Sequence, residues 1–299
     1  DYRFLDSDQF LSRLGDLRFS AFTHTFNNLS GALGMTHEFD KQFSFKANAG
    51  TAFRGPNIAE LASNGAHEGT NRFERGDQNL KPEHSYQVDA SFAYDSDLWR
   101  ASVGGFLNQV NNYIYTANFN KEIDLGTGLP LYRFVQTDAV LRGIEASLTL
   151  HPVPYIHFEN DFSYTIGKNK ALDKPLPMIP AANLRNELKF EPTIKGLSKS
   201  YVSVGLDNYF DQTRVDDTFE SSTAGYSLIN LGVGTTIGIK RQQLSVYVAA
   251  KNLANRKYYN HLSRLKPGRL DIERPELGIL NPGLNVTFGI IMPLSIKRW

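Results

Sequence analysis

The sequence predicts an all-β protein whose strands form an antiparallel transmembrane β-barrel. Three observations support this fold class. Apolar and polar residues alternate with a period of two, which is the periodicity of a strand with one apolar and one polar face. The alternating segments run for ten to twenty residues, and the connections between them are alternately short and long. Aromatic residues also make up 12 % of the 299 residues, a composition that agrees with such a barrel.

The alternation is clearest in four segments. Within 42–53, phenylalanine and alanine alternate with serine, lysine and asparagine, and the same division recurs in 85–94, 144–150 and 284–292. A soluble sandwich would pack these apolar faces between two sheets. A membrane barrel would instead turn them towards lipid. The alternation therefore predicts the strands, but it is compatible with both a soluble sandwich and a membrane barrel.

The predicted strands follow one another along the whole chain. We expect them at 27–38, 42–53, 83–94, 98–116, 131–150, 155–166, 181–191, 199–210, 225–238, 243–254 and 281–294, with the end of a further strand at 1–6.

Strand length and connection length both favour the barrel. Sandwich strands are about 5–6 residues long, whereas tilted membrane strands need about 9–11 or more. Short turns on one rim and long loops on the other are typical of outer-membrane barrels. The expected short connections are 39–41, 95–97, 151–154, 192–198 and 239–242, and the long ones are 7–26, 54–82, 117–130, 167–180, 211–224 and 255–280.

Composition and motifs exclude several classes of function. With 32 Lys+Arg against 31 Asp+Glu, the chain lacks the basic excess of a nucleic-acid binder. The absence of cysteine rules out disulfides, thiol catalysis and Cys-ligated zinc. The sequence contains no Gly-x-Ser-x-Gly, no His-Glu-x-x-His and no phosphate loop. We therefore expect no enzymatic activity, no cofactor and no nucleic-acid partner.

Five segments in order resemble the barrel of a TonB-dependent outer-membrane receptor. Residues 52–61 contain the Phe-Arg-x-Pro that ends a strand, and 76–83 close a long loop with Leu-x-Pro-Glu. Residues 142–145 are similar to the Gly-x-Glu of a long strand, and 251–259 to an Asn-Leu segment near the end of the barrel. Residues 281–285 resemble the Pro-Gly-Arg-Asn that opens the last strand, with leucine in place of the arginine.

The resemblance implies a barrel of twenty-two strands filled by an N-terminal plug domain that couples to TonB. The strands predicted here are about twelve. We therefore expect residues 1–299 to be the C-terminal part of the barrel domain, with the plug domain and the first half of the barrel absent from this sequence.

The resemblance also implies a function. It predicts TonB-dependent active uptake of a scarce nutrient, such as a siderophore or other metal chelate, haem, zinc or cobalamin, across the outer membrane of a Gram-negative bacterium. The implied partners are outer-membrane lipid and lipopolysaccharide, TonB through the missing plug, and an extracellular ligand. The alternative is a passive porin or an autotransporter-type translocator of twelve strands, for which the first and last strands would pair and close the sheet.

The candidate ligand-binding residues are His67, Glu68 and His84. His67 and Glu68 are a neighbouring His-Glu pair, and they lie in the 54–82 connection, the longest in the chain. Imidazole and carboxylate groups bind zinc or a metal chelate, and connections of this length are usually functional or disordered. We expect His67 to be the main ligand, assisted by Glu68 or His84. The alternative is a solvated loop, because adjacent strand residues point to opposite sides.

Other polar residues on the long connections are expected to play simpler roles. Asp216, Asp217 and Glu220 are expected to be solvent-exposed charges. His261 is a possible additional ligand. Gly143, in a strand interior, predicts a bulge or the close approach of a neighbouring group.

Overall fold

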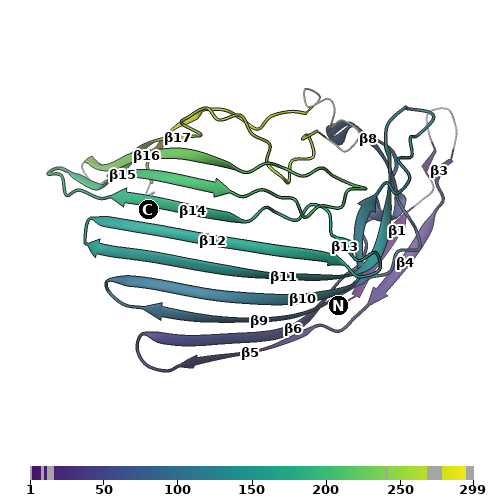
Figure 1. Ribbon diagram of the computed structural model, residues 1–299, viewed down its shortest axis with the longest axis horizontal. Coiled ribbons are helices and arrows are strands. Elements are labelled where there is room, and N and C mark those ends of the chain that lie inside the picture. Colours follow the sequence, from purple (N-terminus) through teal and green to yellow (C-terminus); the bar gives the residue numbers. More distant parts are fainter. Residues whose placement is uncertain (1, 8–9, 12–16, 240–241, 268–277, 294–299) are drawn as a thin grey trace, which may run out of the picture.

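A single curved antiparallel sheet dominates the computed structural model (Figure 1). The structure describes residues 2–7, 10–11, 17–239, 242–267 and 278–293. The sheet contains fourteen strands, and its path runs β18-β17-β16-β15-β14-β12-β11-β10-β9-β6-β5. Each strand on this path pairs antiparallel with the next path strand in the sequence. The sheet is therefore a meander of successive hairpins.

The strands on the path match the predicted segments closely. Their bounds are β5 Gly31–Glu38, β6 Phe43–Arg54, β9 Glu83–Asp95, β10 Trp99–Ala117, β11 Leu131–Val153, β12 Ile156–Asn169, β14 Asn183–Phe190, β15 Leu197–Tyr209, β16 Tyr226–Ile239, β17 Gln242–Lys251 and β18 Asn285–Ile291. The short turns gather at one end of the sheet and the long connections at the other, as the sequence predicts (Figure 1).

The long 54–82 connection is itself folded. It contains helix α1 (Ile58–Ala62), strand β7 (Asn64–His67), the 3-10 turn η1 (Glu68–Thr70) and strand β8 (Arg72–Arg75). A short strand in another connection, β13 (Lys174–Pro175), pairs with β12. No helix in the described part of the chain is long and apolar enough to cross a membrane.

The N-terminal segment departs from the prediction. Strand β1 (Tyr2–Ser7) forms where a strand end was expected, but it pairs with β4 (Phe22–Asn27) in a separate two-stranded sheet. Strands β2 (Phe10–Leu11) and β3 (Leu17–Phe19) form a second small sheet. Most of the described residues of the expected loop 7–26 are therefore in strands, since β2, β3 and most of β4 lie within it.

The predicted strand 27–38 is interrupted near its start. The side-chain Oδ1 of Asn28 accepts a hydrogen bond from the backbone N of Leu29 at 2.6 Å. Local bonds of this kind compete with the ladder of a sheet. As a result β4 ends at Asn27, and β5 begins only at Gly31.

The two faces of the sheet differ sharply in polarity. Leu107 lies opposite Val88 in the register of β10 and β9, and their side chains are 52 % and 56 % exposed. On the other face, cross-strand hydrogen bonds join Asn48 to Asp89 at 2.8 Å and Asn230 to Asp207 at 2.9 Å. No second layer covers the apolar face in the part of the chain that the structure describes. This arrangement contradicts a soluble sandwich, which would bury that face.

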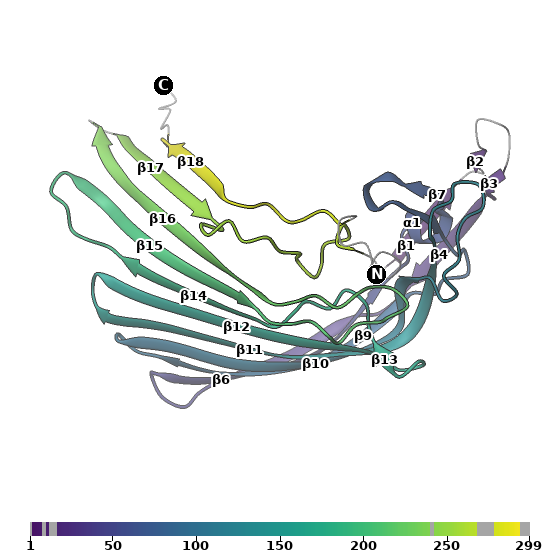
Figure 2. The same ribbon diagram turned by 45° about the horizontal axis from the view of Figure 1, so that its top comes forward.

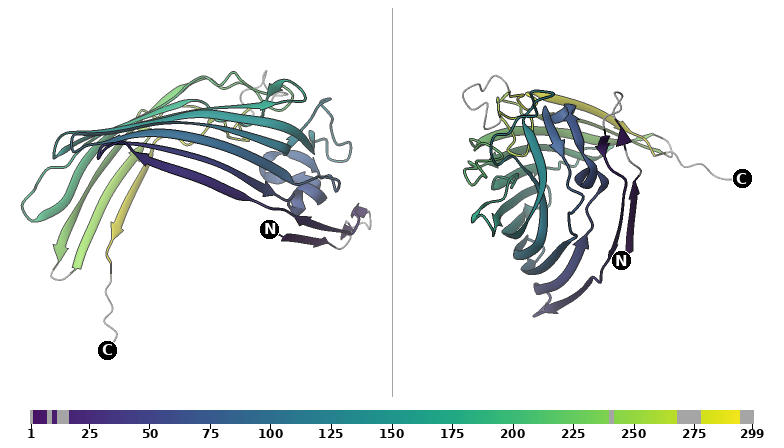
Figure 3. Two further views of the ribbon diagram at one scale, coloured as in Figure 1. Left: turned by 90° about the horizontal axis from the view of Figure 1, so that it is seen from below. Right: turned by 90° about the vertical axis from the view of Figure 1, so that its right-hand side faces the viewer.

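The polar face is the concave one. Arg54 at the end of β6 shares the face of Asn48 and binds Glu60 of α1. The segment from α1 to β8 lies on the concave side of the sheet (Figure 2, Figure 3). The apolar residues are consequently on the convex surface, as in a barrel that faces lipid.

Buried apolar clusters lie at the long-connection end of the strands. One cluster contains Phe22, Leu61, Ala62, Leu80 and Ile114, and the other contains Val110, Ala139, Leu176 and Ile179. Both join residues of the long connections to the strands beneath them. The core of this molecule therefore holds the loops together and leaves the middle of the sheet uncovered.

Gly143 marks a close approach, as expected. A Cβ atom there would lie 2.5 Å from Phe106 Cε1 and 2.7 Å from the backbone oxygen of Tyr164. A side chain at this position would therefore displace both the Phe106 ring and the neighbouring strand.

The sheet is open. Strands β5 and β18 stand at the two ends of the path and do not pair with each other among the described residues. Regular pairing between them would have favoured a closed twelve-stranded barrel. The open curved sheet instead agrees with the expectation of a partial barrel.

Introducing arginine on the two faces should have opposite outcomes. In the full-length protein, Val88→Arg and Phe288→Arg should each impair assembly, by about 2–4 kcal/mol near the midplane, because a charge would face hydrocarbon. Gln87→Arg, next to Val88 on the polar face, should assemble normally. The measurement is the folded fraction in outer-membrane preparations by heat-modifiable electrophoretic mobility. Equal damage on both faces would contradict the lipid-facing assignment.

Candidate functional site

Arg54 links residues 52–61 to residues 76–83, two of the segments that carry the family resemblance. Its Nη1 lies 2.8 Å from Glu60 Oε1, and its Nε lies 2.7 Å from Glu83 Oε2. Glu60 also closes a capping box at the start of α1, because Asn57 Oδ1 accepts from the Glu60 N while Glu60 Oε2 accepts from the Asn57 N. These motif residues therefore anchor the 54–82 connection to β6 and β9.

Strand β8 places Arg72 between aromatic rings. Residues 73–75 pair in parallel with the first residues of β11, so that Phe73 lies opposite Leu131 and Glu74 opposite Tyr132. The Arg72 guanidinium carbon lies 4.6 Å from the ring centre of Tyr132 and 5.5 Å from that of Phe219. This is the geometry of a cation–π interaction, and it joins two long connections to the start of strand β11.

Two further charges complete the group that we call the Arg72 cluster, namely Arg72, Glu74, Tyr132, Phe219 and Arg264. Glu74 Oε1 lies 3.6 Å from Arg72 Nε and 3.9 Å from Arg264 Nη1. Burial lowers the pKa of Arg72, and the nearby charge of Arg264 lowers it further, although an arginine remains protonated in proteins. Arg72 is buried, whereas the side chain of Arg264 is 47 % exposed. The cluster thus contains one accessible cation, Arg264, next to a buried group in which Arg72 packs on two aromatic rings.

A second cluster joins the 210–225 connection to the described part of the 252–284 connection. Glu220 Oε2 lies 3.1 Å from Lys266 Nζ and 3.2 Å from His261 Nε2, the latter within ion-pair distance but without hydrogen-bond geometry. Glu220 Oε1 accepts from the backbone N of Met178 at 2.9 Å. Glu220 and His261 are each 4 % exposed. We call Glu220, His261 and Lys266 the Glu220 cluster.

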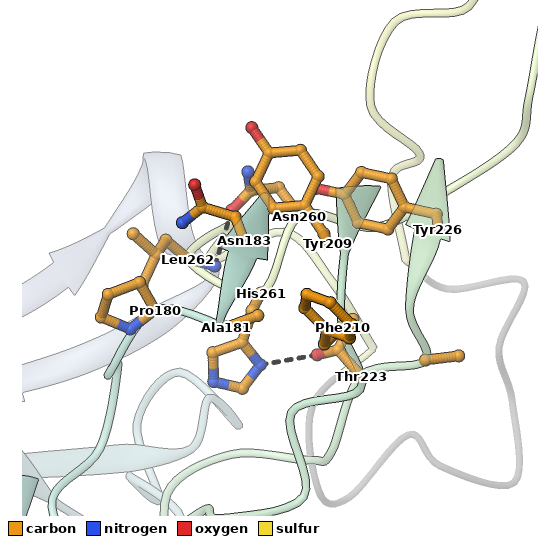
Figure 4. A pocket seen from close by; sticks show the side chains of 11 residues that line it. Pro180, Ala181, Asn183, Tyr209, Phe210, Thr223, Tyr226, Asn260, His261 and Leu262 are labelled. Carbon is orange, nitrogen blue, oxygen red and sulfur yellow. Dashed lines mark hydrogen bonds between the residues drawn. The ribbon is translucent and has the colours of Figure 1, made fainter. Parts of the chain in front are cut away.

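A small pocket opens beside this cluster (Figure 4). Thr223 Oγ1 and His261 Nδ1 are 2.7 Å apart along one wall. Tyr209 and Tyr226 stack with ring centres 4.7 Å apart, and Tyr258 packs on Tyr226 at 4.3 Å. The pocket is lined by Pro180, Ala181, Asn183, Tyr209, Phe210, Thr223, Ala224, Tyr226, Asn260, His261 and Leu262.

Two of the three loop carboxylates were wrongly expected to be solvated. Glu220 is buried in its cluster, and Asp216 is only 1 % exposed. Asp216 Oδ1 accepts hydrogen bonds from the backbone N and the hydroxyl of Thr218 at 2.9 and 2.6 Å, which stabilises a turn. Asp217 is exposed as expected and pairs with Lys174 at 2.9 Å.

The structure separates the environments of the predicted ligands. His67 is exposed at the end of β7, opposite Arg72 in the register of β7 and β8. Glu68 begins η1, but its side chain lies outside the described residues. His84 lies in β9, with Nδ1 3.0 Å from Asn28 Nδ2. No three His, Asp or Glu side chains converge on a metal-binding point within the described ranges. Ligand binding by these residues stays a prediction.

The Arg72 cluster was not foreseen from the sequence. The alternation of charge and aromatic residues in Arg72-Phe73-Glu74-Arg75 is a signal that a strand lies there. Its parallel pairing with β11 and its contact with Phe219 depend on tertiary packing, which a single sequence does not reveal.

Comparison with known proteins identifies the family. The model of the TonB-dependent receptor-like β-barrel matches residues 2–253. This chain belongs to the TonB-dependent receptor family. The family is one of outer-membrane receptors and transporters rather than enzymes.

Two curated proteins that resemble this receptor barrel are named as siderophore receptors. A probable TonB-dependent siderophore receptor, PirA, of Acinetobacter baumannii is 24 % identical over 295 residues, covering 85 % of this chain and 39 % of the relative. The ferrienterobactin receptor of Escherichia coli is 25 % identical over 186 residues, 58 % of this chain and 25 % of that receptor. The receptor barrel described here thus spans well under half the length of these relatives.

Solved structures agree on the fold. The copper transporter OprC aligns with a TM-score of 0.69 and 20 % identity, covering 91 % of this chain and 39 % of that chain. The siderophore receptor PirA from Acinetobacter baumannii aligns with a TM-score of 0.59 and 19 % identity, covering 89 % and 40 %. The prediction of a TonB-dependent receptor barrel is confirmed.

Acid should loosen the contact between the two connections that Glu220 joins. Burial raises the pKa of Glu220, but its contacts with His261 and Lys266 outweigh burial, and the net pKa lies below the ordinary value of 4.5. A carboxylate with a lowered pKa stabilises the folded state above its ordinary pKa and loses this contribution as the pH falls. Amide hydrogen exchange in 210–225 should therefore accelerate below about pH 4.5, after correction for intrinsic rates.

The matched variant is Glu220→Gln. It should show faster exchange in 210–225 at neutral pH, because Lys266 loses its buried partner, and little further change on acidification. An acid response that persists in this variant would assign the effect to another group.

Proposed function

We propose that the full-length receptor takes up an anionic ferric chelate of the siderophore class across the outer membrane, driven by TonB. The observation that carries this proposal is the Arg72 cluster at the long-connection end of a receptor barrel whose relatives are named as siderophore receptors. Siderophores hold iron through oxygen atoms that commonly bear negative charge. An accessible guanidinium held at the edge of a buried, fixed cluster suits such a ligand, because it offers a charge and planar hydrogen-bond donors to anionic oxygen atoms.

Within the cluster we assign different roles to the two arginines. Arg72 is buried against Tyr132 and Phe219 and positions these rings. Arg264 carries its charge on an exposed side chain. Arg264 is the residue we expect to touch the ligand.

TonB acts in this proposal through a plug domain that lies against the concave face. That face is hydrogen-bonded and polar, and it places Glu159 directly opposite Glu187 in the register of β12 and β14. Like charges in this position destabilise a sheet unless something compensates them. A plug with basic side chains would supply that compensation and would link the barrel to TonB.

The passive alternative has weaker support. A porin or autotransporter-type translocator of twelve strands would close its own sheet, whereas β5 and β18 are not paired with each other in the part of the chain that the structure describes. The named relatives are receptors for siderophores. We therefore favour energised uptake in an outer membrane that also brings lipid and lipopolysaccharide against the convex face.

Uptake should depend on Arg264. In cells that rely on the full-length receptor, Arg264→Ala should raise the ferric-siderophore concentration needed for half-maximal uptake of radioactive iron. One exposed charge contact of about 1 kcal/mol corresponds to roughly a five-fold change. Arg100→Ala is the matched control, because Arg100 is also exposed and ion-paired but lies at the short-turn end.

The same assay tests the function as a whole. Uptake that persists in a strain without TonB would contradict active transport. If Arg264→Ala and Arg100→Ala change the half-maximal siderophore concentration equally at equal surface abundance, the Arg72 cluster takes no part in ligand capture.

We further propose that His67 contributes to ligand capture, with Glu68 or His84 assisting. His67 is exposed on the same β7–β8 hairpin that carries Arg72. The double variant His67→Ala with His84→Ala should slow metal-limited growth while leaving receptor abundance unchanged. Unaltered uptake at normal receptor abundance would indicate that the 54–82 connection is only a solvated loop.

A further inference from the structure

A group of ionisable side chains at the short-turn end has no part in the proposed uptake. His151 lies in β11, His157 lies in β12, and Glu191 directly follows β14. The Nδ1 atoms of the two histidines are 2.6 Å apart, and His157 Nε2 lies 3.1 Å from Glu191 Oε2. The strand ends that carry these residues, at the turn between β11 and β12 and after β14, lie at the end of the sheet opposite β8 (Figure 1).

An irregularity in the sheet brings the two rings together. Leu150 pairs with Phe158 and Val153 pairs with Ile156, so that His151 and Pro152 together oppose the single residue His157. Such a bulge re-aims side chains and is common near functional sites. Here it turns the His151 ring edge-on to His157, with ring centres 4.8 Å apart and an interplanar angle of 75°.

The backbone on both sides is fixed. The His151 N donates to the oxygen of Leu98 at 2.7 Å, and the Glu191 N donates to the oxygen of Tyr155 at 2.8 Å. Lys189 pairs with Glu191 Oε1, which holds this carboxylate next to the ring of His157.

The contact with Glu191 assigns the tautomer of His157. A carboxylate accepts, so Nε2 of His157 carries the proton and donates it to Glu191. Nδ1 of His157 is then unprotonated, and its lone pair accepts the hydrogen bond from Nδ1 of His151. A histidine that donates one ring N–H to a carboxylate and presents the other nitrogen is the usual arrangement of a metal ligand and its supporting group.

We propose that His151 and His157 bind one divalent transition-metal ion through their two Nδ1 atoms, with Glu191 orienting His157. In the metal-free form the proton between the two Nδ1 atoms belongs to His151. Metal binding needs both nitrogens unprotonated, so His151 carries its proton on Nε2 in the bound form. Water or an external ligand fills the remaining positions, because Glu191 lies on the far side of the His157 ring and no third side chain converges there among the described residues.

The spacing selects among metals. With metal–nitrogen distances of about 2.0 Å, two neighbouring ligands of a square-planar ion are about 2.8 Å apart, and two ligands of a tetrahedral ion about 3.3 Å. The observed 2.6 Å is a hydrogen-bond distance of the metal-free form, and the two rings need to separate less to reach the square-planar value than the tetrahedral one. Square-planar coordination by imidazole is typical of Cu²⁺ and Ni²⁺, and Cu²⁺ binds more tightly than either neighbour in the series. We therefore expect the order Cu²⁺, then Ni²⁺, then Zn²⁺.

The test uses the purified full-length receptor in detergent, stripped with a chelator and titrated with Cu²⁺, Ni²⁺ and Zn²⁺ by calorimetry. Low-temperature electron paramagnetic resonance of the Cu²⁺ form should show a tetragonal site with imidazole nitrogen coupling. His151→Gln and His157→Gln should each remove this site. His37→Gln is the matched control, because His37 lies near the end of β5 beside another short turn, and it should leave the imidazole-coupled Cu²⁺ signal intact.

Glu191→Gln separates a supporting role from a merely structural one. Loss of such a group typically weakens metal binding about 10–100-fold, so this variant should keep the tetragonal signal but require more Cu²⁺. Folding is monitored by heat-modifiable mobility, which all four variants should preserve. The proposal fails if the folded wild-type receptor shows no imidazole-coupled Cu²⁺ signal. It also fails if the signal survives unchanged in either His151→Gln or His157→Gln.

Discussion

The cross-strand backbone hydrogen bond is the interaction on which this structure depends. A sheet without a second layer cannot rely on a packed interior, and where one face meets hydrocarbon every backbone group must be satisfied within the sheet. The nine strands that lie between β5 and β18 on the path meet this demand by pairing with a neighbour on each side. The side chains are then free to differ by face, apolar on the convex surface and hydrogen-bonded on the concave one.

The loops use a different source of stability. Their buried apolar residues gather above the strand ends, and their charges pair with one another rather than with water. Arg54, Arg72 and Glu220 each join segments that are distant in the sequence. The long connections therefore form a packed assembly that keeps its aromatic and charged groups in fixed positions, which is what selective capture of a ligand requires.

Much of the sheet was predictable because its signals are local. A period of two, the strand length and the alternation of short and long connections each depend on residues within one hairpin, and they placed β6, β9, β10 and β12 within a few residues. The failures have a common physical origin. The pairing of β1 with β4, the burial of Asp216 and the packing of Arg72 on Phe219 all depend on partners far away in the chain. A single sequence carries little information about such partners.

The hairpin order of the sheet has a consequence for folding. Nearly every strand contact joins segments that follow one another in the chain, so these contacts form with little loss of loop entropy. The parallel contact between β8 and β11 is different, because β9 and β10 must be in place before residues 73–75 can reach their partners. The meander is therefore expected to form first and the α1–β8 segment to dock onto it afterwards, so that the Arg72 cluster is completed only on a barrel wall that is already built.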